Sequence, residues 1–191
     1  LEASLGYFIN PLINVVFGML FLRERFRRLQ WVAVALATTG VLVQLWQFGS
    51  LPIIGLGLAL SFALYGLVRK KIQVDAQSGM LIETAWLFPL AAIYLFGFAD
   101  SATSHLSANP LILNLKLVAA GIVTTIPLML FAAACARLRL STVGFFQYLG
   151  PTLMFLLAVL FYGESLTPDK MVTFGFIWLA LAIFIIDAIA F

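Results

Sequence analysis

The stretch ASLGYFINPLINVVFGMLFL, residues 3–22, contains no charged side chain, and the six residues that follow it, RERFRR, include four arginines. A helix of about 20 apolar residues crosses a bilayer, because it rises about 1.5 Å per residue and the hydrocarbon core is about 30 Å thick. A basic cluster beside such a helix is typical of the cytoplasmic side. The stretch therefore predicts a transmembrane helix that ends at a cytoplasmic loop.

The whole chain shares this apolar character. Of its 191 residues, 63% are hydrophobic and 10% are charged, and the mean hydropathy is +1.10. An ordinary soluble domain has about 45–50% apolar and 25% charged residues. The composition therefore excludes a water-soluble domain, a disordered chain and a coiled coil. The apolar runs are continuous and do not alternate, which argues against a β-barrel.

Charged residues and turn signals divide the chain into seven apolar segments. We expect an all-α, polytopic membrane helix bundle, with helices at residues 3–22, 29–47, 52–69, 79–98, 116–136, 141–163 and 170–189. Most basic residues fall in alternate loops: Arg23, Arg25, Arg27, Arg28, Arg69, Lys70, Lys71, Arg137 and Arg139. Lys116 and Lys170 fall on the other side. The positive-inside rule then places the arginine-rich loops and the C-terminus, after Asp187, in the cytoplasm.

An internal repeat relates the first predicted helix to the sixth at an offset of 140 residues. Four positions of one helix recur in the other: Pro11, Leu20, Phe21 and Glu24 match Pro151, Leu160, Phe161 and Glu164. The second copy lies five helices after the first, and an odd number of spans inverts it in the membrane. Inverted repeats are typical of secondary transporters, whose substrate site lies near the midplane between the halves. We expect an N-terminally truncated chain from a parent of ten helices and roughly 280 to 300 residues.

Six stretches carry a resemblance to a known family: SLGYFINPL (4–12), FLRER (21–25), SFALYGLVRKK (61–71), ET (83–84), GFFQYLGPT (144–152) and FIWLAL (176–181). The chain resembles the EamA family of the drug/metabolite transporter superfamily, and within it the RarD branch. The resemblance implies a ten-helix carrier of two inverted five-helix repeats in the bacterial inner (plasma) membrane. Residues 1–50 would then be the C-terminal helix pair of the first repeat, and residues 51–191 the complete second repeat.

Candidate substrate-cavity residues lie on the first helix. Tyr7, Asn10 and Asn14 share one face with Pro11. The two amides lie roughly 10 to 12 Å deep, near the bilayer centre, where facing lipid would be costly. They therefore either line a cavity or bond a neighbouring helix.

The sixth helix supplies the matching candidates Gln147 and Tyr148, together with Gly150 and Pro151. Pro11, Gly150 and Pro151 are the predicted helix-break or hinge positions for alternating access. The alternative is a tight helix crossing through Gly150. Tyr65, inside the third helix, is a further cavity candidate because its hydroxyl needs a partner or a wet cavity.

Glu83 is a carboxylate well inside an apolar segment, which makes it the candidate for proton or substrate coupling. The nearest cations in the sequence are Arg69, Lys70 and Lys71. A structural ion pair or a snorkelling side chain is therefore the alternative.

The remaining residues give no sign of an enzyme. The single His105 and the single Cys135 lie apart, and we find no metal-ligand spacing and no phosphate-binding glycine motif. We expect no catalytic residue, cofactor, metal ion or nucleic-acid partner. The expected partners are the lipid bilayer and a small-molecule substrate, with a coupling proton and a homodimer as open alternatives. The favoured function is secondary transport of a small metabolite or drug-like solute, and the alternative is a non-transporting scaffold or receptor subunit.

Overall fold

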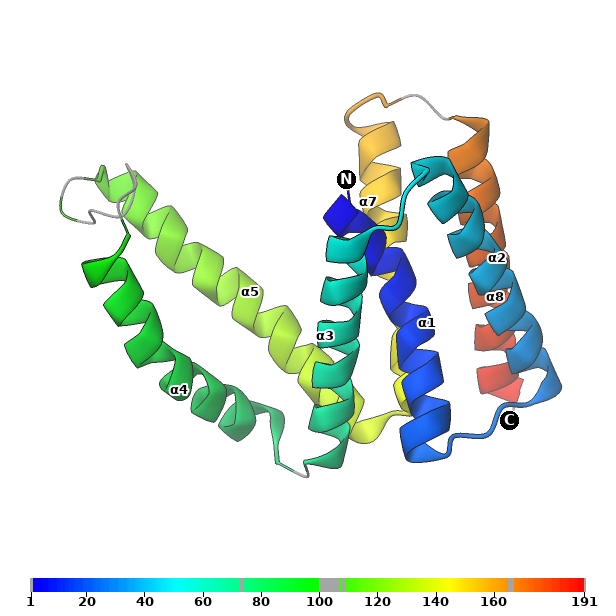
Figure 1. Cartoon of the computed structure of the whole chain (residues 1–191), viewed down its shortest axis with the longest axis horizontal. Helices are drawn as coiled ribbons and strands as arrows, with labels where there is room; N and C mark the ends of the chain where they lie inside the picture. The colour runs from blue at the N-terminus through cyan, green and yellow to red at the C-terminus, as the bar shows by residue number, and fades with distance from the viewer. Residues whose placement is uncertain (1, 73, 100–106, 108, 165–166, 191) are drawn as a thin grey trace. The chain divides into compact units, whose positions relative to one another are not determined.

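The computed structural model describes residues 2–72, 74–99, 107, 109–164 and 167–190 (Figure 1). Within these residues the chain forms helices and no strand: α1 (Glu2–Leu22), α2 (Arg28–Phe48), α3 (Ile53–Lys71), α4 (Ala76–Gly97), α5 (Leu111–Arg137), α6 (Leu140–Gln147), α7 (Leu149–Leu160) and α8 (Pro168–Ala190). Seven segments of the described chain are long and apolar enough to cross a membrane, with α6 and α7 together forming one of them. The predicted all-helical, multi-pass membrane bundle is confirmed.

Two helices begin earlier than a simple count of apolar residues predicts: α5 begins at Leu111, where residue 116 is the predicted start, and α4 also begins early. The helix begins at Ala76, whereas Gly79 was the predicted first residue. The Asp75 carboxylate accepts a hydrogen bond from the Ser78 backbone N–H at 2.8 Å, which caps the helix earlier than hydropathy indicates. This backbone hydrogen bond, aided by the Ser78 side chain, holds the pKa of Asp75 below its ordinary value.

The segment predicted as one helix at residues 141–163 is divided in two. α6 ends at Gln147 and α7 begins at Leu149. Pro151 has no N–H to donate to the Gln147 carbonyl four residues earlier, so the helical ladder loses a hydrogen bond at this point. The Tyr148 N–H donates to the Phe145 carbonyl at 3.1 Å, a tighter turn than an α-helix makes.

The chain forms two compact units. One comprises Leu1–Lys70 with Leu138–Phe191, and the other is Lys71–Arg137. The second unit contains α4 and α5, which pack against each other as a hairpin. The first unit contains the remaining helices and therefore both helix pairs related by the 140-residue offset.

Within the first unit, α1 packs against α6 and α2 packs against α8. The partners run in opposite directions in each pair (Figure 1). Equivalent positions are buried on the two sides of the α2–α8 contact: Ala33, Ala37, Gly40 and Val41 in α2, and Thr173, Ile177, Ala180 and Leu181 in α8. A Cβ on Gly40 would lie 3.1 Å from the Thr173 carbonyl oxygen, so the small residues set how closely the helices approach. Each helix of this pair therefore buries the same face against its inverted counterpart.

The contact between α1 and α6 is also very close. A Cβ on Gly144 would lie 2.8 Å from the Pro11 carbonyl oxygen and 3.0 Å from the Asn14 Cβ. On another part of α1, a Cβ on Gly6 would lie 2.9 Å from the Gly55 carbonyl oxygen in α3. These glycines hold α3 and α6 against α1 and bring the α1 amides next to α6.

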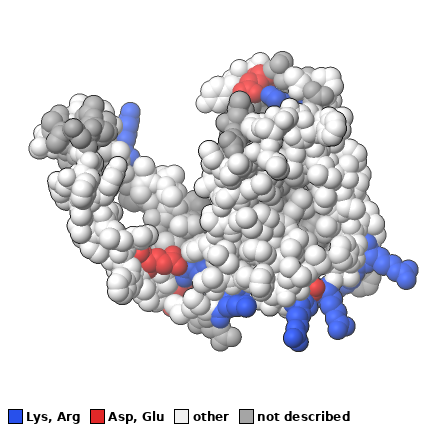
Figure 2. Space-filling view, viewed as in Figure 1, with Lys and Arg blue, Asp and Glu red and all other residues white. Residues whose placement is uncertain are grey.

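Charge in the first unit is concentrated at the ends of the helices. Lys and Arg side chains gather where α1 passes into α2 (Figure 2). Arg23, Arg25, Arg28 and Arg139 are all exposed. This arginine-rich end leaves the long middle of the helices apolar, as a lipid environment requires.

Candidate functional site

Three carboxamides meet across the contact between α1 and α6. Asn10 and Asn14 each donate a hydrogen bond from Nδ2 to the Oε1 of Gln147, at 3.0 Å and 2.7 Å. Asn10 is 7% exposed and Asn14 is 0% exposed, while Gln147 is half-buried. The structure therefore brings together three of the residues that the sequence analysis selected as cavity candidates. We call Asn10, Asn14 and Gln147 the amide cluster.

The amide cluster contains two buried acceptors that its own hydrogen bonds leave unused. The Oδ1 atoms of Asn10 and Asn14 have no hydrogen-bond partner within the described part of the chain. An unsatisfied buried acceptor costs about 1–3 kcal/mol, so each of these two oxygens needs an explanation. The cluster can accept hydrogen bonds from a molecule that supplies donors.

Tyr148 lies beside the cluster, at the break between α6 and α7. Its buried hydroxyl donates a hydrogen bond to the Phe8 carbonyl oxygen at 3.2 Å. Phe8 and Tyr148 occupy equivalent positions, 140 residues apart, in the two copies of the repeat. The amide cluster and the Tyr148–Phe8 hydrogen bond therefore both lie within the contact between α1 and the second copy of the repeat.

The other candidates of this segment have different environments. Tyr7 is 58% exposed and lies on the outer side of α1. α1 continues as one helix through the buried Pro11, whereas the chain breaks its helix near Pro151, which is also buried. Gly150 is exposed, and a Cβ there would meet nothing within 4 Å. The interruption of the helix is thus confined to the second copy.

Tyr65 has a polar partner on its own helix. Its hydroxyl accepts a hydrogen bond from the Nε of Arg69 at 3.0 Å, and the Arg69 guanidinium carbon lies 5.5 Å from the centre of the Tyr65 ring. The buried Arg69 is one turn further along α3. A cation over an aromatic ring is attracted to its negative face. Arg69 therefore supplies the hydrogen-bond partner that the Tyr65 hydroxyl requires.

Glu83 lies on α4 in the second unit and is half-buried. Cys135, near the end of α5, is buried. His105 lies outside the described residues. Among the residues that the structure does describe, no three His, Cys, Asp or Glu side chains form a group that could hold a metal ion.

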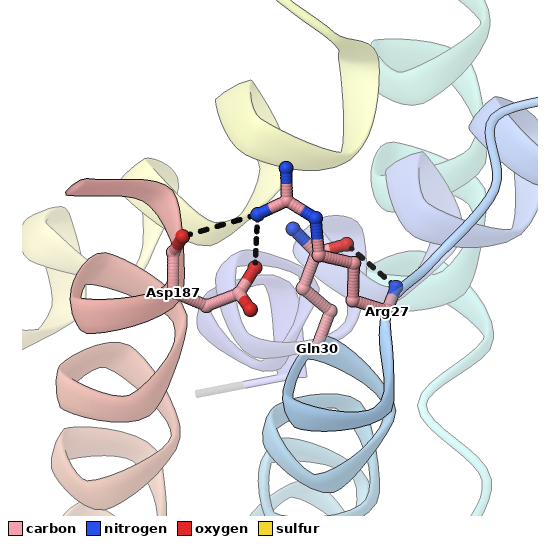
Figure 3. A network of polar contacts seen from close by, with 3 residues as sticks. All are labelled: Arg27, Gln30 and Asp187. Atoms are coloured by element: carbon pink, nitrogen blue, oxygen red, sulfur yellow. Dashed lines mark hydrogen bonds and ion pairs between the residues drawn. The ribbon is translucent and has the colours of Figure 1, made fainter. Parts of the chain in front are cut away.

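One polar network was not found by sequence reasoning. Arg27 Nη1 lies 3.3 Å from both the Oδ2 and the backbone oxygen of Asp187, and the Arg27 N–H donates to Gln30 Oε1 at 3.2 Å (Figure 3). The network joins the start of α2 to the last turns of α8. Asp187 is almost fully buried, so an unpaired charge there would be costly. The signal available in the sequence was a single acidic residue inside the last apolar segment.

Comparison with known proteins identifies the family. The profile of the EamA-like transporter family matches residues 50–186. Over 99% of its length the chain is 75% identical to "Protein RarD" of Escherichia coli strain K12 and 62% identical to an "Uncharacterized transporter" of Vibrio cholerae. It is 43% identical over 96% of its length to "Uncharacterized transporter YojE" of Bacillus subtilis.

These matches cover 64%, 63% and 61% of the three relatives, so the chain spans less than two thirds of their length. No solved structure was found to match it. The family match agrees with the seven apolar helices of the described chain. The chain belongs to the EamA-like transporter family, whose profile covers most of it.

Proposed function

We propose that the chain is part of a secondary transporter that moves a small metabolite or drug-like solute across the bacterial inner membrane by alternating access. The amide cluster carries this proposal, because it lies where α1 meets its inverted counterpart and has two buried, unused acceptors. Substrate sites of inverted-repeat carriers lie near the midplane between their halves. In this scheme residues 1–50 end the first repeat and residues 51–191 form the second, and the family match at residues 50–186 supports that division.

The amide cluster favours a particular class of solute. Asn10 and Asn14 are one helical turn apart on α1, so their Cβ atoms lie about 5–6 Å apart, and the Oδ1 of each can accept a hydrogen bond. The membrane segments at residues 5–22 and 140–160 contain no charged residue that could neutralise an ionic solute. An isolated charge inside a membrane protein is expensive. The expected substrate is therefore an uncharged solute with neighbouring hydroxyl or N–H donors on an apolar body.

The proposed orientation places the arginine-rich end and the C-terminus in the cytoplasm. Arg23, Arg25, Arg28 and Arg139 are exposed at that end, which suits the positive-inside rule. Alternating access would then require the contact between the two copies to open at the cytoplasmic and the outer end in turn.

Transport by the full-length protein in liposomes tests this function. A panel of uncharged solutes is compared with versions whose hydroxyl or N–H groups have been methylated, and we expect saturable flux of the donor-bearing solutes only. Asn10→Val and Asn14→Val should each lower that flux at least about tenfold, as the loss of one buried hydrogen bond predicts. Gly57→Ala on α3 is the control, because a Cβ there meets nothing within 4 Å. Correctly folded protein without saturable flux of any solute would instead favour a scaffold or receptor subunit.

Glu83 is the proposed coupling residue. It is the half-buried carboxylate of α4, and ionisable groups inside membrane helices commonly serve ion coupling. Glu83→Gln should abolish flux driven by a proton gradient and retain flux down a solute gradient. Unchanged gradient-driven flux in this variant would remove Glu83 from the coupling mechanism.

A further inference from the structure

The turns directly after α1 and α7 share two backbone features. Arg23 has φ 55° and its counterpart Gly163 has φ 63°. The N–H of Glu24 donates to the Gly18 carbonyl at 3.0 Å, and the N–H of Glu164 donates to the Ala158 carbonyl at 3.0 Å. Glu24 and Glu164 therefore follow equivalent turns, one at the end of α1 and the other at the end of α7.

The two carboxylates nevertheless bind different partners. Glu24 Oε1 accepts from the Leu140 N–H at 2.6 Å, and Oε2 accepts from the N–H and Oγ of Ser141 at 3.1 Å and 2.5 Å. These groups form the start of α6, where a carboxylate meets free N–H groups and the positive end of the helix dipole. Glu164 instead pairs with Lys170 at 3.2 Å, and its side chain is 57% exposed.

The two copies also differ by one methyl group close to these carboxylates. A Cβ on Gly18 would lie 2.6 Å from Glu24 Oε2 and 3.5 Å from the Ser141 nitrogen, so the Glu24 carboxylate would have to shift if residue 18 carried a side chain. The equivalent residue 140 positions later is Ala158. The Glu24 carboxylate therefore occupies space beside the start of α6 that Gly18 leaves open.

We propose that Gly18 and Glu24 form a latch that holds the arginine-rich end of α1 against the start of α6. The hydrogen bonds are charge-assisted and partly buried, so they are stronger than bonds between neutral groups. Closing this end would bias an alternating-access carrier towards the state that is open on the opposite side. The inference rests on the proposed function, because such a latch controls access only in a carrier.

Spin-label distances test the latch without requiring a substrate. In the full-length protein in nanodiscs, with other cysteines removed, labels are placed at Arg25 and Arg139, which are exposed on either side of the latch. Gly18→Ala should displace the carboxylate, and Glu24→Gln should remove its charge. Each is expected to raise the ratio of long to short label distances about tenfold, from the loss of a carboxylate at a helix N-terminus. Gly57→Ala should leave the distances unchanged.

The result that would overturn the latch is a distance distribution unchanged in both Gly18→Ala and Glu24→Gln. The second variant adds no atom against the helix, so it remains informative if Gly18→Ala fails to fold. If the label distances are unchanged in both variants and solute flux is measurable, the latch is rejected and the proposed transport function is retained. Longer distances without flux of any solute would reject transport and keep the latch.

Discussion

Replacing Gln147 by leucine should destabilise the protein more than replacing either asparagine. Gln147 Oε1 is the acceptor for both Asn10 Nδ2 and Asn14 Nδ2, so the variant leaves two further buried polar groups without partners. Each such group costs about 1–3 kcal/mol, which gives about 2–6 kcal/mol for the pair. Interhelical hydrogen bonds in membrane proteins average about 0.6 kcal/mol, which favours the lower part of that range. We therefore expect a loss of about 2–3 kcal/mol.

Asn14→Val provides the contrast, because it removes an unpaired Oδ1 together with the donor beside it. It should cost less than about 1 kcal/mol, since the buried oxygen no longer needs a partner. The assay is unfolding of the purified full-length protein in mixed micelles, followed by circular dichroism. The double variant with Gln147→Leu should cost less than the sum of the single changes, as expected for residues in contact. Additive effects, or equal losses in the two single variants, would refute the reasoning.

Three further predictions concern the backbone and the helix ends. Arg23→Gly should stabilise the protein by up to about 1 kcal/mol in the same assay, because Arg23 has φ 55° where its counterpart is Gly163; a loss of stability would contradict this account. Gly144→Ala should cost about 1–3 kcal/mol, since its Cβ would lie 2.8 Å from the Pro11 carbonyl oxygen, and Gly175→Ala should be nearly neutral. The Asp75 cap, whose pKa is lowered, should stabilise the start of α4 above pH 3.8 and be lost as the pH falls through the lowered value. Amide exchange at Ser78, corrected for intrinsic rates, should show this dependence and lose it in Asp75→Asn.

Hydropathy alone predicts the membrane segments well. Each span needs about 20 apolar residues regardless of its neighbours, so the boundaries of α2 and α8 differ from the expected ones by only one or two residues. The start of α4 was missed because it depends on one side-chain hydrogen bond, from Ser78 to Asp75. The break at Tyr148 lies close to Gly150 and Pro151, two of the predicted helix-break positions, although the expected helix boundaries treat residues 141–163 as one helix.

The contacts between helices were harder to foresee. The polar face of α1 and the matching residues of the sixth predicted helix were selected from depth and periodicity, and Asn10, Asn14 and Gln147 do meet. The partner of Glu24 lies 116 residues away and that of Arg27 lies 160 residues away. A single sequence does not specify which helices are adjacent, so these pairings become visible only in the fold.

The separation between the asparagines and their acceptor has a consequence for biosynthesis. Gln147 lies 137 residues after Asn10, so α1 enters the membrane long before α6 has been translated. During that interval two carboxamides near mid-bilayer have no native acceptor, which makes early release of α1 into lipid unfavourable. α1 is therefore expected to remain beside the insertion machinery until α6 has been made. The contact between α1 and α6 can therefore form only after the ribosome has synthesised the second copy of the repeat.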